Sequence, residues 1–163
     1  MFSHNLIKHV PKGTGAVYWG PGDQVTFLAT GAETNGAFFL CECLVPPGGG
    51  PPPHVHHRED ESFYVQEGEL TLHAGDQTLS ASAGDFVHVP RGTVHSFRNT
   101  STMNAKMLVL ATPAGLEKFF EEAFDPAPER GGVPPLPSEA LIARLMIVAP
   151  KHGLEILLPA VGD

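Results

Sequence analysis

The stretch GGGPPPHVHHREDESFYVQEG, residues 48–68, decides the fold. His54 and His56 lie two residues apart, so on a β-strand both imidazoles point to one face. Glu61 follows at an odd offset from them, and we expect the polar residues 57–60 to bend the chain and return Glu61 to the histidine side. Imidazole nitrogens and a carboxylate oxygen are good ligands for a first-row transition metal. The stretch therefore predicts a metal site built on strands.

A second stretch, GDFVHVPRGTVHSFRN over residues 84–99, has the composition of a hairpin with one more imidazole. Pro90 and Gly92 indicate a tight turn between two apolar runs. His95 begins the run after the turn and shares a strand face with Phe97. If this hairpin packs beside the first stretch, His95 supplies a third imidazole to the same site.

The two stretches together resemble the two motifs of the cupin superfamily, in the single-domain form called cupin 2. The first fits G-x5-H-x-H-x4-E-x6-G and the second fits G-x5-P-x-G-x2-H-x3-N, with every defining position filled. The resemblance implies an all-β fold, a cupin β-barrel that is antiparallel and jelly-roll-like. It also implies one divalent transition metal per chain (iron, nickel, manganese, copper or zinc), held by His54, His56, Glu61 and His95.

The alternative is that these histidines are structural, as in cupins that keep the fold and lose the metal. Three imidazoles and a carboxylate inside an apolar barrel would then be buried polar groups without partners, which is costly. Metal binding is therefore the preferred interpretation.

The organisation of the chain predicts one domain, residues 1–163, with three parts. Residues 1–35 read as an N-terminal strand arm, with β-rich runs at 17–19 and 25–28. Residues 36–112 form the barrel core. Residues 113–163 form a C-terminal helical cover, with helices over 114–124 and from Ser138 to Val148, and a last strand or extended tail over 154–158.

Short apolar or alternating runs separated by turn residues make the barrel core an antiparallel sandwich or barrel. The expected strands are Ala37–Val45, Ser62–Gln66, Glu69–His73, Phe86–Val89, Ser96–Asn99 and Lys106–Ala111.

Charge and composition exclude several classes of protein. The 163 residues carry a net charge of −8 with 10 Lys and Arg, which argues against a nucleic-acid partner. No apolar run approaches the roughly 20 residues of a membrane span. Residues 1–9 are polar and interrupted, unlike a signal peptide, so we expect a cytoplasmic protein.

The remaining chemistry-bearing residues are assigned conservatively. Cys41 and Cys43 share a strand face and could form a soft-metal site, but two buried core residues are the preferred interpretation. The other histidines are expected at the surface or in support of the site. They are His4, His9, His57, His73, His88 and His152.

The predicted substrate pocket carries Phe63, Val65 and Phe97 on the ligand faces. No Lys or Arg shares these faces, which argues against sugar phosphates and polycarboxylates and favours a small, largely apolar or aromatic molecule. The layout also resembles single-domain cupins related to quercetinases. That resemblance implies an oxidoreductase, a metal-dependent dioxygenase of a small aromatic or enolic compound, with Glu61 as ligand and catalytic base and a helix capping the pocket.

Two other classes of function stay open. One is a non-redox cupin metalloenzyme, such as an isomerase, lyase or decarboxylase, and the other is a cupin that binds a small molecule without turnover. A homodimer is also expected, because strand edges need covering. The arm with Tyr18 and Trp19 is the expected partner strand.

Overall fold

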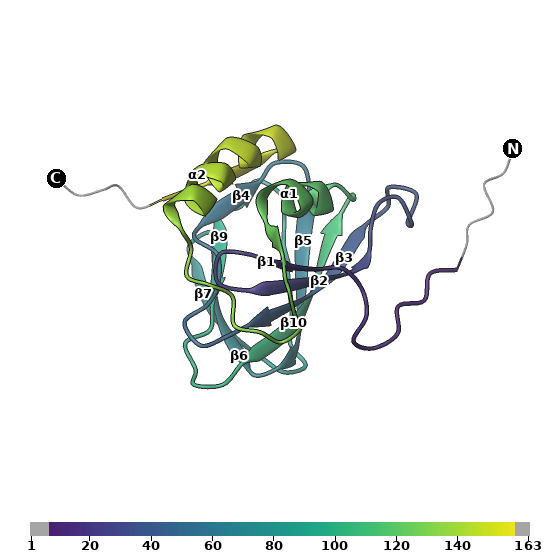
Figure 1. Ribbon diagram of the computed structural model, residues 1–163. Coiled ribbons are helices and arrows are strands. Elements are labelled where there is room, and N and C mark those ends of the chain that lie inside the picture. The colour runs from purple at the N-terminus through teal and green to yellow at the C-terminus, as the bar shows by residue number, and fades with distance from the viewer. Residues whose placement is uncertain (1–6, 159–163) are drawn as a thin grey trace, which may run out of the picture.

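The computed structural model describes residues 7–158, whose strands form two antiparallel sheets (Figure 1). The seven-stranded sheet has the order β11 (Asp125–Pro126), β1 (Val17–Trp19), β2 (Gln24–Ala29), β3 (Phe39–Val45), β10 (Ala105–Thr112), β5 (Asp60–Glu67) and β8 (Phe86–Val89). The five-stranded sheet has the order β12 (Leu154–Ile156), β4 (His54–His56), β9 (His95–Arg98), β6 (Glu69–Ala74) and β7 (Gln77–Ser82).

Alternating side chains place the core between the sheets. In β3, buried residues alternate with half-buried ones from Phe39 to Val45, and β10 repeats the pattern beside it. The two strands pair with Cys43 opposite Met107, so their buried faces coincide. Apolar side chains buried on a shared inner face are the main source of stability in such a sandwich.

The predicted all-β, antiparallel cupin architecture is confirmed. Each run expected in the core segment is a strand, with ends that shift by a few residues. The described strands fall into two hydrogen-bonded sheets instead of one continuous cylinder. Strand β7, which pairs with β6 as a hairpin, was not expected.

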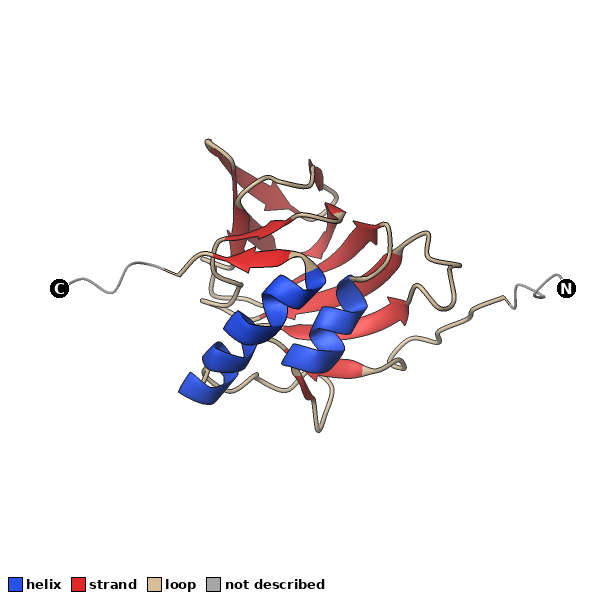
Figure 2. Cartoon of the chain, turned by 90° about the horizontal axis from the view of Figure 1, so that it is seen from above, coloured by secondary structure: helices blue, strands red, loops and turns tan. Residues whose placement is uncertain are grey.

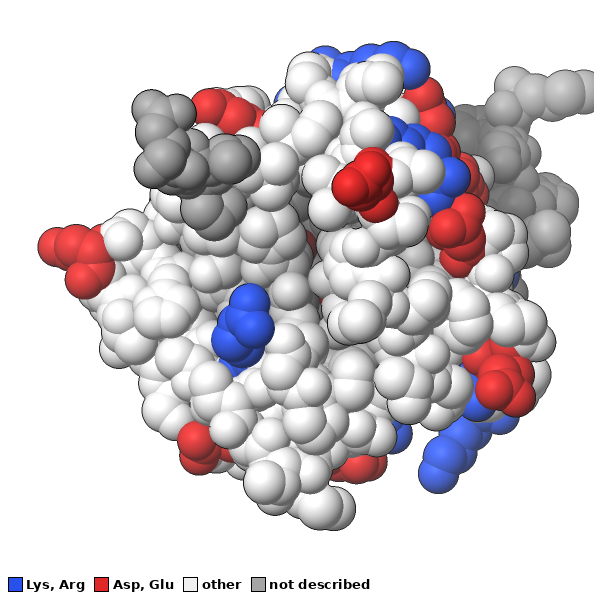
Figure 3. Space-filling view, turned by 60° about the vertical axis from the view of Figure 1, so that its left-hand side comes forward, with Lys and Arg blue, Asp and Glu red and all other residues white. Residues whose placement is uncertain are grey.

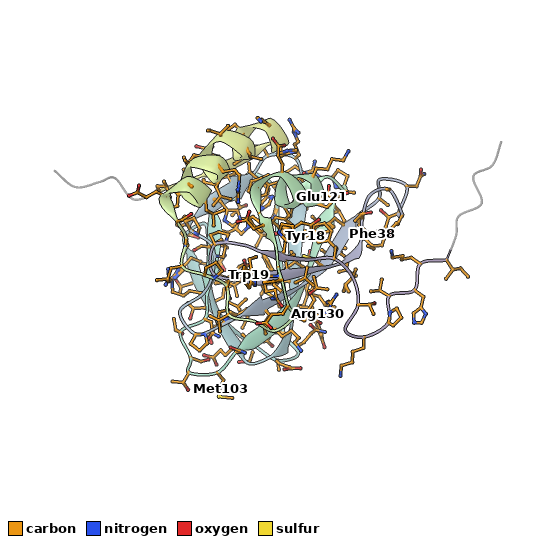
Figure 4. The ribbon with its side chains drawn as sticks, viewed as in Figure 1. Tyr18, Trp19, Phe38, Met103, Glu121 and Arg130 are labelled. Atoms are coloured by element: carbon orange, nitrogen blue, oxygen red, sulfur yellow. The ribbon has the colours of Figure 1, made fainter. Side chains whose placement is uncertain are left out.

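The N-terminal arm is part of the seven-stranded sheet. Strand β1 lies between β2 and β11 of its own chain, so both of its edges are already paired. Tyr18 packs on Phe27 with the ring centroids 4.8 Å apart, and Figure 4 shows Tyr18 and Trp19 on this strand within the body of the molecule. The arm is therefore not a free strand for a second copy, contrary to expectation.

Two helices lie side by side on one side of the sheets (Figure 2). They are α1 (Leu116–Ala123) and α2 (Glu139–Val148), and the 3₁₀ helix η1 (Ala149–His152) follows. Ser138 caps the start of α2, since its Oγ accepts a hydrogen bond from the Leu141 amide at 3.1 Å. The chain then leaves η1 through Gly153, whose φ of 73° is left-handed.

No helix in residues 7–158 is long and apolar enough to cross a membrane. On the face drawn in Figure 3, Lys and Arg side chains are scattered between acidic and uncharged ones and form no continuous basic surface. His4 lies outside the described residues.

Candidate metal centre

The four predicted ligands meet between the two sheets. His54 on β4 pairs in register with His95 on β9, both in the five-stranded sheet, and His56 follows on β4. Glu61 comes from β5 of the seven-stranded sheet. All four side chains are buried, and one ligand atom from each lies within 4.8 Å of the others.

The distances suit a small cation. Glu61 Oε2 lies 2.8 Å from His95 Nε2 and 3.4 Å from His56 Nε2. Ligand bonds of about 2.0–2.2 Å place opposite donors roughly 4.4 Å apart, so a small inward movement of the widest pair would close the shell. The donor set and spacing therefore fit a first-row transition metal.

Backbone carbonyls fix the tautomers of two of the histidines. Nδ1–H of His54 donates to the Pro52 carbonyl at 2.9 Å, and Nδ1–H of His95 donates to the Thr93 carbonyl at 2.9 Å. A carbonyl oxygen can only accept, so the proton sits on Nδ1 and the Nε2 lone pair faces the centre. This is the arrangement that a metal-binding imidazole needs.

The third histidine, His56, has a carboxylate near its Nδ1 atom, where the other two have a backbone carbonyl. His56 Nδ1 lies 3.6 Å from Glu59 Oε2, and both side chains are buried. Within the described part of the chain neither atom has another hydrogen-bond partner. Glu59 is thus placed to orient His56 from behind, as outer carboxylates do for metal-bound histidines.

The electrostatics keep Glu61 ionised and His54 neutral, the protonation states in which these two side chains bind a metal. Burial favours the neutral form of Glu61, but His56, His95 and His54 outweigh it and lower the pKa of Glu61 to about 2. Burial, reinforced by the neighbouring imidazoles, lowers the pKa of His54 to about 4. Burial also lowers the pKa of His56, yet the charge of Glu61 and the contact with Glu59 leave it above its usual value.

The motif residues that are not ligands hold the site together. Gly48 N–H donates to the Asn99 carbonyl at 2.7 Å, and Gly92 N–H donates to the His56 carbonyl at 2.7 Å. Asn99 is fully buried, and its Nδ2 donates to the Val45 carbonyl at 2.8 Å. These bonds tie the loop before β4 and the turn before β9 to each other's strands, and so fix the distance between the histidines.

A cavity of about 80 Å³ opens beside the cluster and is lined by three of the four candidate ligands, His54, His56 and Glu61. Its wall is mainly apolar, and none of the described residues that line it is Lys or Arg. The lining residues are Pro21, Asp23, Cys41, Cys43, Pro51, Pro52, His54, His56, Glu61, Phe97, Val109, Phe119, Phe120, Phe124, Leu145, Leu154 and Ile156.

The cavity agrees only in part with the expected pocket. Phe97 lines it, whereas Phe63 and Val65 are buried in the core and do not belong to its wall. Phe63 instead packs against Phe97, with the ring centroids 6.0 Å apart. Strand parity puts all three on the same side but does not tell which neighbour covers them, so the expected pocket is corrected here.

The two cysteines are buried as expected, and they also line the cavity. The hydrogen bond with Cys41, together with burial, raises the pKa of the Cys43 thiol well above its usual value. Both thiols are free, and neither belongs to the cluster of four ligands. His88, by contrast, is exposed and bonded to Ser62 at 2.9 Å, so it faces away from the site.

Most residues of the cavity wall were not expected from the sequence. Pro21 and Asp23 come from the turn between β1 and β2, and Phe119, Phe120 and Phe124 come from α1 and its end. The only advance signal was the expectation that a helix after the core caps the pocket, which these phenylalanines match. Nothing in the local pattern separated Asp23 from an ordinary turn aspartate.

Comparison with known protein families identifies the central part of the chain. A family model described as Cupin domain matches residues 41–111. Quercetin 2,3-dioxygenase from Bacillus subtilis (strain 168) is 36% identical over 106 residues, which cover 64% of this chain and 31% of that enzyme. The chain thus spans about a third of the length of this relative.

Solved structures agree on the fold. The polyketide cyclase from Streptomyces resistomycificus is 27% identical with a TM-score of 0.57, covering 66% of this chain and 80% of the cyclase. An RmlC-like cupin from Shewanella frigidimarina is 20% identical with a TM-score of 0.58, covering 68% of this chain and 94% of that one. At that identity the second match shows the fold alone.

Proposed function

Because the chain belongs to the cupin superfamily and carries a complete cluster of three histidines and one glutamate, we propose that it is a metal-dependent dioxygenase of a small aromatic or enolic compound. One observation carries the proposal. Glu61 is a buried carboxylate that lies against the imidazoles of His56 and His95 and stands at the wall of an apolar cavity. The sequence similarity to quercetin 2,3-dioxygenase supports the reaction class.

Glu61 supplies the basic oxygen of the site. Its contacts with His56 and His95 both use Oε2, so Oε1 remains for a proton from a substrate hydroxyl. A bound divalent metal would supply Lewis acidity and, for a redox-active ion, electron transfer with oxygen. The surrounding aromatic wall excludes water and strengthens each polar contact made inside the cavity.

The size of the cavity narrows the substrate. A cavity of roughly 150 Å³ is known to hold benzene, and the space here is about 80 Å³. A compact enolic compound therefore fits better than a molecule of several fused rings. A flavonol would require α1 and α2, which supply part of the wall, to move outward.

Oxygen consumption is the direct test. Protein loaded separately with iron, nickel, manganese, copper and zinc would be assayed for oxygen uptake with a diketone, a catechol and a flavonol. We expect uptake with at least one redox-active metal and the greatest rate with the smallest enolic substrate. Absence of uptake with every metal and substrate would overturn the dioxygenase assignment.

A non-redox metalloenzyme is the second candidate, because a polyketide cyclase is among the structures that this chain matches. Such an enzyme would use the metal as a Lewis acid and would work without oxygen. Turnover by the zinc-loaded protein under anaerobic conditions would favour it. Tight binding of a ligand without turnover by any loaded form would favour a binding protein.

We also propose that the whole chain works as one domain. The strands before the core, the core itself and the helices after it all contribute to the same cavity wall. The homodimer and the cytoplasmic setting stay predictions.

A further inference from the structure

Asp23 is an acid that the proposed chemistry does not use. It lies just before β2, is 6% exposed, and lines the same cavity as Glu61. It also lies outside residues 41–111, the part of the chain that matches the cupin family model. The metal cluster, which is complete without it, does not include it.

Within residues 7–158 the Asp23 side chain makes no hydrogen bond, yet its oxygens are not among the fully buried atoms that lack a partner, so they reach the open space of the cavity that Asp23 lines. Burial, with a smaller contribution from the charge of Glu61, raises the pKa of Asp23 to about 7. A polar group that projects into a mainly apolar cavity is the kind of group that orients a bound small molecule. The missing partner is therefore expected to come from a ligand in the cavity.

The turn that carries Asp23 is built to hold it in place. Gly20 N–H donates to the Asp23 carbonyl at 2.9 Å, and Gly22 N–H donates to the Gly20 carbonyl at 2.9 Å. A Cβ atom at Gly20 would lie 2.3 Å from Asp23 Oδ1 and 2.8 Å from the Phe124 ring. The absence of a side chain at Gly20 thus lets the carboxyl sit between the turn and the aromatic wall.

We infer that Asp23 is the second polar anchor of the cavity and hydrogen-bonds one oxygen of a ligand whose other oxygen faces the metal site. The inference rests on the proposed function and narrows its substrate class to compact molecules with two oxygen groups, such as a hydroxyketone or an enolised diketone. In a cavity of about 80 Å³ a ligand that fills the space comes within reach of both Asp23 and Glu61, since both line it. Asp23 acts here as a positioning residue for the substrate.

Ligand binding without turnover tests this role. Zinc-loaded protein would be titrated anaerobically by calorimetry with hydroxyacetone and with acetone, which differ by one oxygen, and then with acetoin and 2-butanone, which differ in the same way. A hydrogen bond of ordinary strength predicts about tenfold tighter binding of the two-oxygen member of each pair. The Asp23→Ala variant should lose this preference, and the closely isosteric Asp23→Asn variant should keep part of it.

The control is Asp76→Asn, which removes an acid from the exposed turn between β6 and β7. It should keep the full preference, and metal content should match wild type in all three variants. If wild type and Asp23→Ala prefer the two-oxygen probes equally, the metal alone contacts both oxygens, and the role of Asp23 is overturned. The role is also overturned if wild type binds none of the four probes. Missing oxygen uptake with an intact Asp23-dependent preference would overturn only the dioxygenase assignment.

Discussion

His95 Nε2 and Glu61 Oε2 lie 2.8 Å apart, although the Thr93 carbonyl already holds the proton of His95 on Nδ1. Two lone pairs at that distance repel each other unless a cation lies between or beside them. A proton or a metal ion can fill this role, and the metal also satisfies the other two imidazoles. The contact joins the two sheets at the point where the cavity begins.

The first prediction concerns metal content. His95→Ala removes one of four ligands, so metal per chain after purification should fall sharply, as measured by elemental analysis. His88→Ala is the matched control, because His88 is exposed and bonded to Ser62. Stoichiometric metal in His95→Ala would contradict the site.

The second prediction separates binding from proton transfer. Glu61→Gln keeps the size and one oxygen ligand but removes the basic carboxylate. We expect much of the metal to remain and oxygen uptake to fall about 10²–10⁴-fold, the usual contribution of a general base. If the loaded variant turns over as fast as wild type, Glu61 is not the base.

The third prediction concerns the support behind His56. Glu59→Gln replaces the carboxylate that lies 3.6 Å from His56 Nδ1, and we expect metal affinity to drop about 10–100-fold in competition with a chelator. Glu155→Gln is the control, since Glu155 pairs with the exposed His57 at 3.1 Å. Equal losses in both variants would show a general charge effect instead of support for His56.

The fourth prediction is a pH dependence of stability in the metal-free protein. Asp23 has a raised pKa of about 7 in the folded state, so the unfolded chain ionises first and wild type loses stability as the pH rises from about 4 to about 7. Asp23→Asn escapes this loss and should be more stable at pH 8 by up to about 4 kcal/mol. Urea unfolding at pH 4 and pH 8 measures it, with Asp76→Asn unchanged. A stability difference that does not grow with pH would refute the assignment.

The fifth prediction concerns the homodimer. Since β1 is paired on both edges, the dimer needs another strand, and the edge strand β8 carries the exposed Phe86 opposite the exposed Tyr64. Aromatic side chains on an open edge strand favour association with a second copy. Phe86→Glu should then shift the sedimentation coefficient from dimer to monomer at micromolar concentration.

Met103→Glu is the control for that experiment, because Met103 is also exposed but lies on a loop at the opposite end from the helices (Figure 4). A wild-type particle of 17.4 kDa would end the idea of a dimer.

The sequence was enough to predict that the four candidate metal ligands cluster, because the local spacing of the residues determines which strand face each one occupies. His54 and His56 share a face by strand parity, and Pro90 with Gly92 places the turn that delivers His95. The core strands could also be predicted, because each contains an alternating or continuous run of apolar residues. Strand β7 could not be predicted because most of its residues, QTLSAS, are small or polar and face outward.

The cavity could not be predicted in the same way, because it depends on which segments meet after folding. Phe63 and Phe97 both belong to apolar faces, yet only Phe97 reaches the open space. Asp23 lines the cavity only because β1 and β2 join the seven-stranded sheet in a position that brings the turn between them to the cavity. Such contacts join residues that are far apart in the chain, and the periodicity of apolar residues does not predict them.

The candidate metal ligands and much of the cavity wall come from different segments of the chain. All four metal ligands lie within residues 41–111, whereas Asp23, Pro21 and the helix phenylalanines lie outside that segment. A lineage can therefore exchange the two ends of the chain and change the cavity wall while the four candidate metal ligands are kept. A chimaera that grafts the flanking segments of another cupin onto this core would carry the donor's preference with the recipient's metal.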